Sequence, residues 1–174
     1  MQPASLRGQN GGYRGESVYE QSLLNSMGHF GKAEFLGSDS KHVYLRDNDG
    51  TTACLESLGS FRYEGQRRGI SKLIQHPDWK NKAIWLIRED GNTLLNRCKS
   101  DDQLGNSHIE KVRKEVKKLQ DEGLRVWIYA SQEIEWTAES DIEKLDKRML
   151  TGEWKLLGAA VLEESLKEGA KECF

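Results

Sequence analysis

One arginine in the stretch DEGLRVWIYAS has the type and setting to do chemistry. Arg125 begins a segment that is otherwise apolar and aromatic. Because the side chains of a strand alternate between two faces, Arg125 would share its face with Trp127, Tyr129 and Ser131. The planar guanidinium group of arginine binds phosphate through paired hydrogen bonds, and it also stacks on aromatic rings. Arg125 is therefore a candidate phosphate ligand, with stacking on Trp127 or an exposed position at the strand's entry as the alternatives.

The elements around Arg125 can be predicted from local patterns. Ser107 and Glu110 form a capping box that opens a helix, and Gly123 stands where that helix would stop. The apolar positions of this helix have spacings of three and four residues: Ile109, Val112, Val116 and Leu119. A strand is expected over residues 124–131 and a further helix over residues 140–149. The segment WKLLGAAVLEE predicts a buried strand that runs into a final helix.

The first half of the chain predicts a helix followed by several strands. Ser17 and Glu20 form another capping box, which opens a helix through Tyr19, Leu23, Met27 and Phe30. The strand candidates are KAEFLGS, KHVYLRD, TTACLESL, ISKLIQ and AIWLIRE. A hairpin is expected at residues 47–50, a turn at HPDWKNK and a short helix over residues 92–99. These elements predict an α+β fold with a mostly antiparallel sheet flanked by helices.

Composition restricts the class of protein. The chain has 174 residues, a length suited to one domain, and 36% of them are hydrophobic while 31% are charged. The formal net charge is -2, which argues against a general nucleic-acid binder. No apolar run reaches the roughly 20 residues that span a bilayer, and the first residues lack the apolar core of a signal peptide. Residues 1–15 are rich in Gly, Gln and Asn and predict a flexible lead-in.

Metal sites and nucleophilic triads are not indicated. The four histidines are scattered without ligand spacing, and no Ser, His and Asp arrangement stands out. The three cysteines have no paired spacing, so we expect reduced, structural thiols: Cys54, Cys98 and Cys173.

Four segments in order resemble one known family. EGLRVWIYASQEIEW and then WKLLGAAVLEESLKEGAKECF resemble the end of the nucleotide-binding domain of P-type ATPases, in particular the phospholipid-flippase class. The shared motifs there are Gly-Leu-Arg at residues 123–125, Leu-Leu-Gly-Ala at 156–159, an acidic pair at 163–164 and L-x-x-G at 166–169. Earlier, SVYEQSLL resembles the family's S-P-D-E-A-A-L, and FRYEGQRRG resembles F-x-S-D-R-K-R-M-S. The resemblance covers roughly residues 17 to 172.

The resemblance implies a set of nucleotide-binding residues. Phe61 would stack on adenine, Glu20 would hydrogen-bond the adenine region, and Arg125 would reach the phosphates. Arg67 is a further candidate from the same comparison. Each has a structural alternative: a core position for Phe61, the helix cap for Glu20 and a solvated surface for Arg67 and its neighbour Arg68.

The sequence departs from the family at one corner of this site. The family's K-G-A, whose lysine lines the nucleotide pocket, falls on Arg88-Glu89-Asp90. Arg88 keeps the positive charge but is bulkier and planar, and two small residues become acids. Acids beside a polyphosphate raise its electrostatic cost, so we expect weak ATP binding, with Mg²⁺ arriving together with the nucleotide.

The function implied by the resemblance is that of an ATP-binding domain, over residues 16–174, from a phospholipid-transporting membrane protein. Its partners would be the phosphorylation and actuator domains of the parent chain, toward which the last 15 or so residues would return. The phosphorylated D-K-T-G-T motif of the family is missing from this chain, so the domain would not turn over ATP alone. It would lie on the cytoplasmic side of the membrane without touching the bilayer or nucleic acid.

Two other functions remain open at this point. One is a degenerate regulatory pseudo-ATPase domain, such as the flippase-like region fused to guanylyl cyclases in apicomplexan and ciliate proteins. The other is a protein-interaction module that shares the fold.

Overall fold

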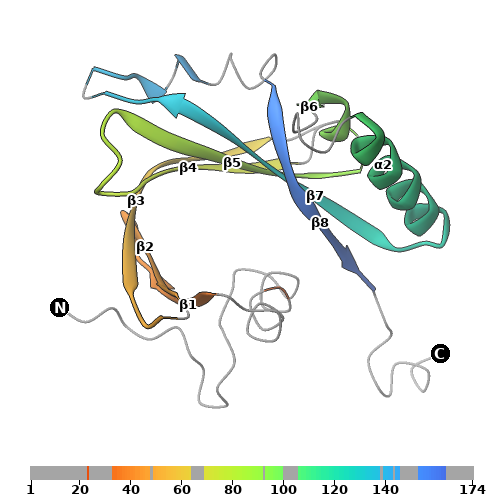
Figure 1. Cartoon of the computed structure of the whole chain (residues 1–174), viewed down its shortest axis with the longest axis horizontal. Helices are drawn as coiled ribbons and strands as arrows, with labels where there is room; N and C mark the ends of the chain where they lie inside the picture. Colours follow the sequence, from red (N-terminus) through yellow and green to blue (C-terminus); the bar gives the residue numbers. More distant parts are fainter. Residues whose placement is uncertain are drawn as a thin grey trace. The chain divides into compact units, whose positions relative to one another are not determined.

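A β-rich α+β fold is formed by the parts of the chain that the computed structural model describes (Figure 1). Its elements are β1 (Ala33–Ser38), β2 (His42–Asp47), β3 (Thr52–Tyr63), β4 (Gly69–Gln75), β5 (Lys82–Asp90), the 3-10 helix η1 (Leu95–Arg97), β6 (Cys98–Lys99), α2 (Asn106–Asp121), β7 (Arg125–Glu135) and β8 (Trp154–Leu162). The residues described are 23, 33–47, 49–63, 69–91, 93–99, 106–137, 139–142, 144–145 and 153–163.

The strands hydrogen-bond in the order β1-β2-β3-β4-β5-β7-β8-β6. The pairs β1–β2, β2–β3 and β7–β8 are antiparallel, whereas the two-residue strand β6 runs parallel to the start of β8. The prediction of an antiparallel sheet in an α+β fold is thereby confirmed at this level. The chain divides into two compact units, one made of Met1–Ser60, Lys72–Ile84 and Glu133–Ser140, the other of Phe61–Ser71, Trp85–Gln132 and Asp141–Phe174.

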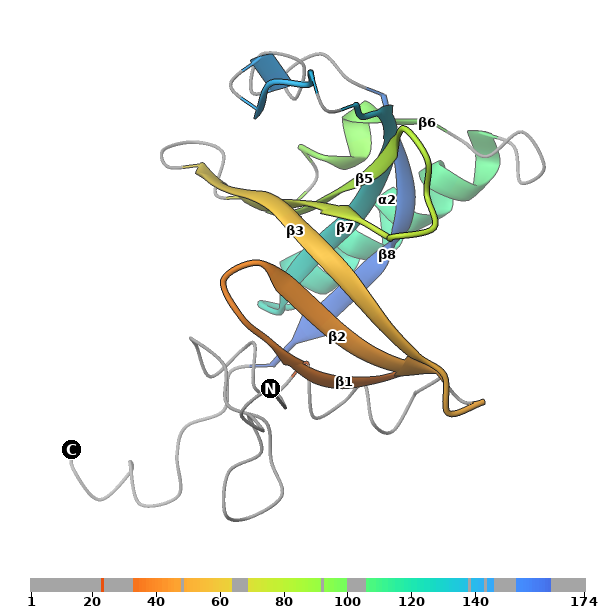
Figure 2. The same cartoon turned by 90° about the vertical axis from the view of Figure 1, so that its left-hand side faces the viewer.

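The first unit contains the hairpins β1–β2 and β2–β3, seen side by side in Figure 2. The turn predicted at residues 47–50 is present: the Gly50 amide donates to the Asp47 carbonyl at 3.0 Å. Gly50 has φ +85°, a conformation that glycine adopts without strain. The preceding turn is organised by Asp39, whose carboxylate accepts hydrogen bonds from the amides of Lys41 and His42, both at 2.7 Å. Short-range side-chain and turn chemistry thus fixes these hairpins.

The core of the second unit lies under α2, which Figures 1 and 2 both show beside β7 and β8. Ile109 and Val116 are buried on α2, at positions on the apolar stripe that the sequence predicts. The predicted inner face of β7 is also buried, through Val126, Ile128 and Ala130. The other face of β7 is covered as well at its centre, because Trp127 is 7% exposed.

Aromatic rings fill the rest of this core. The ring centroids of Trp85 and Trp154 are 5.6 Å apart in an edge-on arrangement, and those of Phe61 and Trp85 are 5.9 Å apart. Offset and edge-on contacts at this spacing are the favoured geometry of aromatic pairs. The cluster joins three strands, through Phe61 near the end of β3, Trp85 within β5 and Trp154 at the start of β8.

The strand β8 corrects one expectation. The sequence predicts a buried strand here, but alternate residues are exposed, with Leu157 at 57% and Val161 at 46%. The physical reason is position: β6 pairs only with Trp154 and Lys155, so the rest of β8 has a strand neighbour on one side only among the described residues. A β-bulge in its pairing with β7 lies next to Gly158.

Other predicted elements differ in extent. The short helix expected over residues 92–99 is a single 3-10 turn followed by β6, and β3 continues to Tyr63. Of the helix expected over residues 140–149, the described residues Ile142, Lys144 and Leu145 are helical. Leu23 is the one described residue of the predicted first helix, and it is helical too. The lead-in, the final helix and the two chain ends lie outside the described residues.

Candidate functional site

The turn before Arg125 ends α2 in a Schellman motif. The Leu124 amide donates to the Leu119 carbonyl and the Gly123 amide to the Gln120 carbonyl, both at 3.0 Å. Gly123 has φ +84°, as the residue after the helix must in this motif. The helix therefore stops where the sequence predicts, and the chain enters β7 with Arg125 as its first residue.

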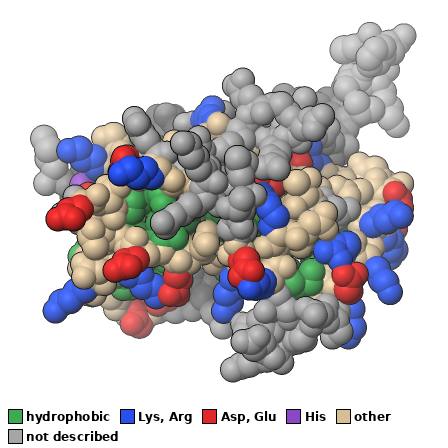
Figure 3. Space-filling model, turned by 90° about the horizontal axis from the view of Figure 1, so that it is seen from above, with side chains coloured by type: hydrophobic (Ala, Val, Ile, Leu, Met, Phe, Trp, Pro, Cys, Tyr) green, Lys and Arg blue, Asp and Glu red, His purple; other side chains and the backbone are tan. Residues whose placement is uncertain are grey.

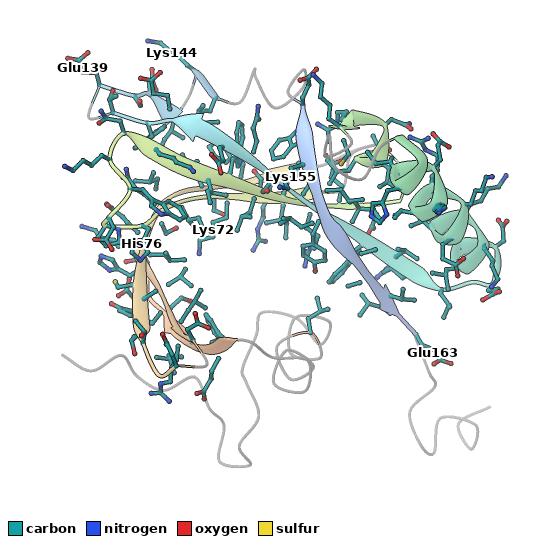
Figure 4. All side chains as sticks on the ribbon, in the orientation of Figure 1. Lys72, His76, Glu139, Lys144, Lys155 and Glu163 are labelled. Atoms are coloured by element: carbon teal, nitrogen blue, oxygen red, sulfur yellow. The ribbon has the colours of Figure 1, made fainter. Side chains whose placement is uncertain are left out.

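Arg125 lines a pocket of about 580 Å³ in the second unit. Residues from the end of β5, the turn after α2, the start of β7 and the end of β8 surround it: Asp90, Gly91, Gln120, Glu122, Gly123, Leu124, Arg125, Val126 and Glu163. The Gly91 amide donates to the Val126 carbonyl at 3.3 Å, which ties the end of β5 to β7 beside the pocket. Glu163, labelled in Figure 4, follows the last residue of β8. The volume is in the range of small-molecule sites.

The charge around this pocket is acidic. Among the described residues that line the pocket, Arg125 is the one cation, and three carboxylates accompany it, from Asp90, Glu122 and Glu163. A free polyphosphate would be repelled by such a lining, whereas a metal-bound phosphate or a ligand with a positive group would meet less repulsion. The arrangement can therefore bind an anion through one guanidinium group, but with a charge balance unfavourable to a highly negative ligand.

Arg88 takes part in a separate arrangement in the same unit. Its guanidinium carbon lies 3.9 Å from the ring centroid of Trp127 on the neighbouring strand β7. This distance is well within the range of a cation–π contact. Arg88 is not among the residues that line the pocket of Arg125. The alternative interpretation of Arg125 was a cation stacked on Trp127. A cation does stack on this ring, but it is Arg88.

The two acids that follow Arg88 have different surroundings. Glu89 points into the core, with its side chain 4% exposed, and the Arg97 guanidinium donates to it at 2.5 Å. Asp90 is exposed and lines the pocket. Because neighbouring strand residues face opposite ways, Glu89 is separated from Arg88 and its carboxylate is neutralised internally. Of these two acids, only Asp90 would add negative charge beside a phosphate bound in the pocket.

Phe61 is half-buried and packs on Trp85 in the aromatic cluster. This contact agrees with the alternative in which Phe61 is a core residue. Stacking of Phe61 on adenine stays a prediction. Glu20 and Arg67 lie outside the described residues. The structure therefore brings Arg125 and Asp90 into one pocket and leaves Phe61 and Arg88 in neighbouring packing contacts of the same unit.

The acids Glu122 and Glu163 were not predicted as site residues. Glu122 was detectable, since it precedes the glycine that ends α2 and leads directly to Arg125. Glu163 comes from the far end of the chain, and only the pairing of β7 with β8, which sets Arg125 opposite Leu162, brings it to the pocket.

The described residues include no cluster of three or more His, Cys, Asp or Glu side chains suited to hold a metal ion. Among those same parts of the chain, no helix has the length and apolar character needed to cross a membrane. Figure 3 shows acidic and basic side chains interspersed over the coloured part of one face. Compared with known proteins, the chain matches no family model, and no curated protein is significantly similar to it.

Proposed function

We propose that this chain is the nucleotide-binding domain of a P-type ATPase-like protein of the phospholipid-flippase class, and that the Arg125 pocket receives the phosphates of ATP. The observation that carries the proposal is the position of Arg125. It follows Gly123 and Leu124 as in the family motif, and it lines a pocket of about 580 Å³. A guanidinium group at the rim of a pocket is suited to hydrogen-bond phosphate oxygens.

The adenine end of ATP would be held by Phe61, with Glu20 and Arg67 as further ligands by resemblance. Mg²⁺ would arrive with the nucleotide and reduce the repulsion between the phosphates and the three carboxylates of the pocket. Because one arginine faces three acids, we expect a dissociation constant of roughly 1 mM or weaker, corresponding to about -4 kcal/mol. The phosphorylation domain of a parent chain would supply the remaining phosphate contacts.

The test is a titration of the chain with Mg-ATP, followed by NMR shifts. Backbone and side-chain signals of Phe61, Arg88 and Arg125 are expected to move together. Arg125→Ala is expected to weaken binding by about 1 to 3 kcal/mol, the range for losing a charge-assisted hydrogen bond. Arg46→Ala, which removes an exposed cation from the first unit, is the matched control and should leave the affinity unchanged.

Two partial ligands separate the two ends of the site. Adenosine should shift signals near Phe61, whereas magnesium tripolyphosphate should shift those near Arg125. The absence of any saturable shift near residues 61, 88 and 125 with Mg-ATP would overturn the proposal.

A second candidate function is that of a regulatory pseudo-ATPase domain with a degenerate nucleotide pocket. The acidic lining favours it, because three carboxylates around one arginine oppose a polyphosphate. Under this alternative the wild-type chain binds no Mg-ATP. Neutralising the lining with Asp90→Asn and Glu163→Gln should then create measurable binding, which the same titration would detect.

A further inference from the structure

The backbone around the Arg125 pocket is largely committed to hydrogen bonds within the fold. Four amides of the lining residues already donate to backbone carbonyls at 3.0 to 3.3 Å: those of Gly91, Glu122, Gly123 and Leu124. The side-chain donors among the described lining residues are the guanidinium group of Arg125 and the carboxamide of Gln120. A phosphate in this pocket therefore depends mainly on side chains, and not on a nest of backbone N–H groups of the kind that cradles polyphosphates elsewhere.

One guanidinium group is matched to one phosphate group. Its planar fork presents parallel N–H groups to two oxygen atoms of the same phosphate, which is the geometry in which arginine recognises phosphate best. A second phosphate of the same ligand would meet no further cation among the described lining residues. The attraction that the pocket offers to a polyphosphate is therefore hardly greater than the attraction that it offers to a single phosphate.

The repulsion, in contrast, grows with every phosphate added. The charged groups among the described lining residues are three carboxylates and one guanidinium group, which together give a formal charge of -2. The acids come from three segments, because Asp90 ends β5, Glu122 follows α2 and Glu163 follows β8. The repulsion is therefore not confined to one wall of the pocket. Size does not set the limit, since about 580 Å³ is within the range of sites that hold drug-sized ligands.

We propose that the Arg125 pocket holds a single phosphate group, and that Asp90, Glu122 and Glu163 keep the other phosphates of the ligand outside it. This inference rests on the proposed function, because it specifies how that site binds ATP. One phosphate group is enclosed on Arg125, and the others extend into solvent, where a second domain has access to them. The three acids are then specificity-determining residues, since they limit how much of a polyphosphate the pocket takes up.

The test compares inorganic phosphate, pyrophosphate and tripolyphosphate, all without metal. Binding to the full chain is followed through the NMR signals of Gly123 and Arg125, at constant ionic strength and about pH 8, where the phosphates are ionised. The affinity for tripolyphosphate should exceed that for phosphate by no more than about threefold, the statistical advantage of three phosphate groups. A larger rise with the number of phosphates overturns the proposal.

Neutral variants test the role of the acids. Asp90→Asn, Glu122→Gln and Glu163→Gln change exposed side chains, so the fold should persist, which circular dichroism checks. Each should strengthen tripolyphosphate binding by about two- to fivefold and phosphate binding by less, because the repulsion removed is proportional to the charge of the ligand. Glu135→Gln, at an exposed position in the first unit, is the matched control and should change neither affinity. Equal strengthening of both anions, or none, contradicts the role given to the acids.

A parallel titration with Mg-ATP separates this inference from the proposed function. If Mg-ATP shifts the signals of Phe61 and Arg125 but tripolyphosphate binds far more tightly than phosphate, the single-phosphate pocket is wrong and the nucleotide site stands. If the anions behave as expected but Mg-ATP causes no shift near Phe61, the pocket remains a phosphate site and the nucleotide function is wrong. No saturable shift near Arg125 with any of these ligands overturns both.

Discussion

The guanidinium carbon of Arg88 lies 3.9 Å from the ring centroid of Trp127, so a cation of β5 stacks on the indole of the neighbouring strand. In the family resemblance, Arg88 stands where a lysine lines the nucleotide pocket. The planar guanidinium group suits a flat stack in a way that a lysine ammonium does not. An arginine at this position therefore makes a packing contact that a lysine would make less well.

The Arg88–Trp127 contact should be measurable as a coupling. Arg88→Ala is expected to lower the free energy of unfolding by about 1 kcal/mol, and Arg88→Lys by less, since the charge stays. In the Trp127→Leu background, Arg88→Ala should cost about 0.5 to 1 kcal/mol less than in the wild-type chain. Urea denaturation gives the four values, and Lys114→Ala is a neutral control. Strictly additive effects would show that the stack contributes nothing.

Gly69 is expected to tolerate no side chain. A Cβ atom there would lie 2.8 Å from Cγ of Glu89 and 3.1 Å from the carbonyl oxygen of Arg88. Because Glu89 is held by Arg97 in the core, it cannot move aside cheaply. Gly69→Ala should therefore lower the free energy of unfolding by about 1 to 3 kcal/mol. Denaturant titration checks this, and combining it with Glu89→Ala should give a loss smaller than the sum of the two.

Asp39 should make the first unit sensitive to acid. The backbone amide of Lys41, followed by that of His42 and the Tyr44 hydroxyl, stabilises the carboxylate and lowers its pKa from 3.8 to about 2. Because the folded pKa is depressed, its stabilising contribution is complete above about pH 4 and is lost as the pH falls toward 2. An NMR titration of the Asp39 carboxyl carbon measures the pKa directly. Asp39→Asn should remove this part of the pH dependence, and an unshifted pKa would contradict the hydrogen-bonding account.

Cys98 should react slowly with alkylating agents in the folded chain. Burial raises the pKa of its thiol from 9.0 to about 11, so at a given pH below both values the thiolate fraction falls roughly a hundredfold. Mass spectrometry after iodoacetamide treatment at pH 8 should show Cys98 unmodified until denaturant is added. Rapid modification of Cys98 in the native chain would show that the thiol is accessible and ionised.

Elements with local signals were predictable from the sequence. The hairpin at residues 47–50, the end of α2 at Gly123 and the alternation of β7 depend on turn chemistry, helix capping and side-chain period. All three depend on a few neighbouring residues, so they can be predicted without knowing which distant segments pack against them. The prediction of an α+β fold with an antiparallel sheet rests on the sum of these local signals.

Properties that depend on the order of strands were not predictable. The apolar run in WKLLGAAVLEE predicted a buried strand, but the place of β8 near the edge of the sheet leaves Leu157 and Val161 exposed. The same limit applies to the site. Arg125 was singled out from its own strand, whereas Glu163 reaches the pocket, and Arg88 reaches Trp127, through strand pairings between distant parts of the chain. Periodicity within one segment carries no information about such neighbours.

The short parallel pair of β6 with β8 has a consequence for the order in which the sheet forms. Between Cys98–Lys99 and their partners Trp154–Lys155 the chain contains α2, β7 and the segment before β8, so this pairing closes a long loop. The β1–β2–β3 hairpins close short loops and have a much smaller entropic barrier. In a pulsed hydrogen-exchange experiment during refolding, the amides of β2 should therefore become protected early and those of β6 last. The pairing expected to form last therefore lies next to residues 156–162 of β8, which have a strand neighbour on one side only among the described parts of the chain.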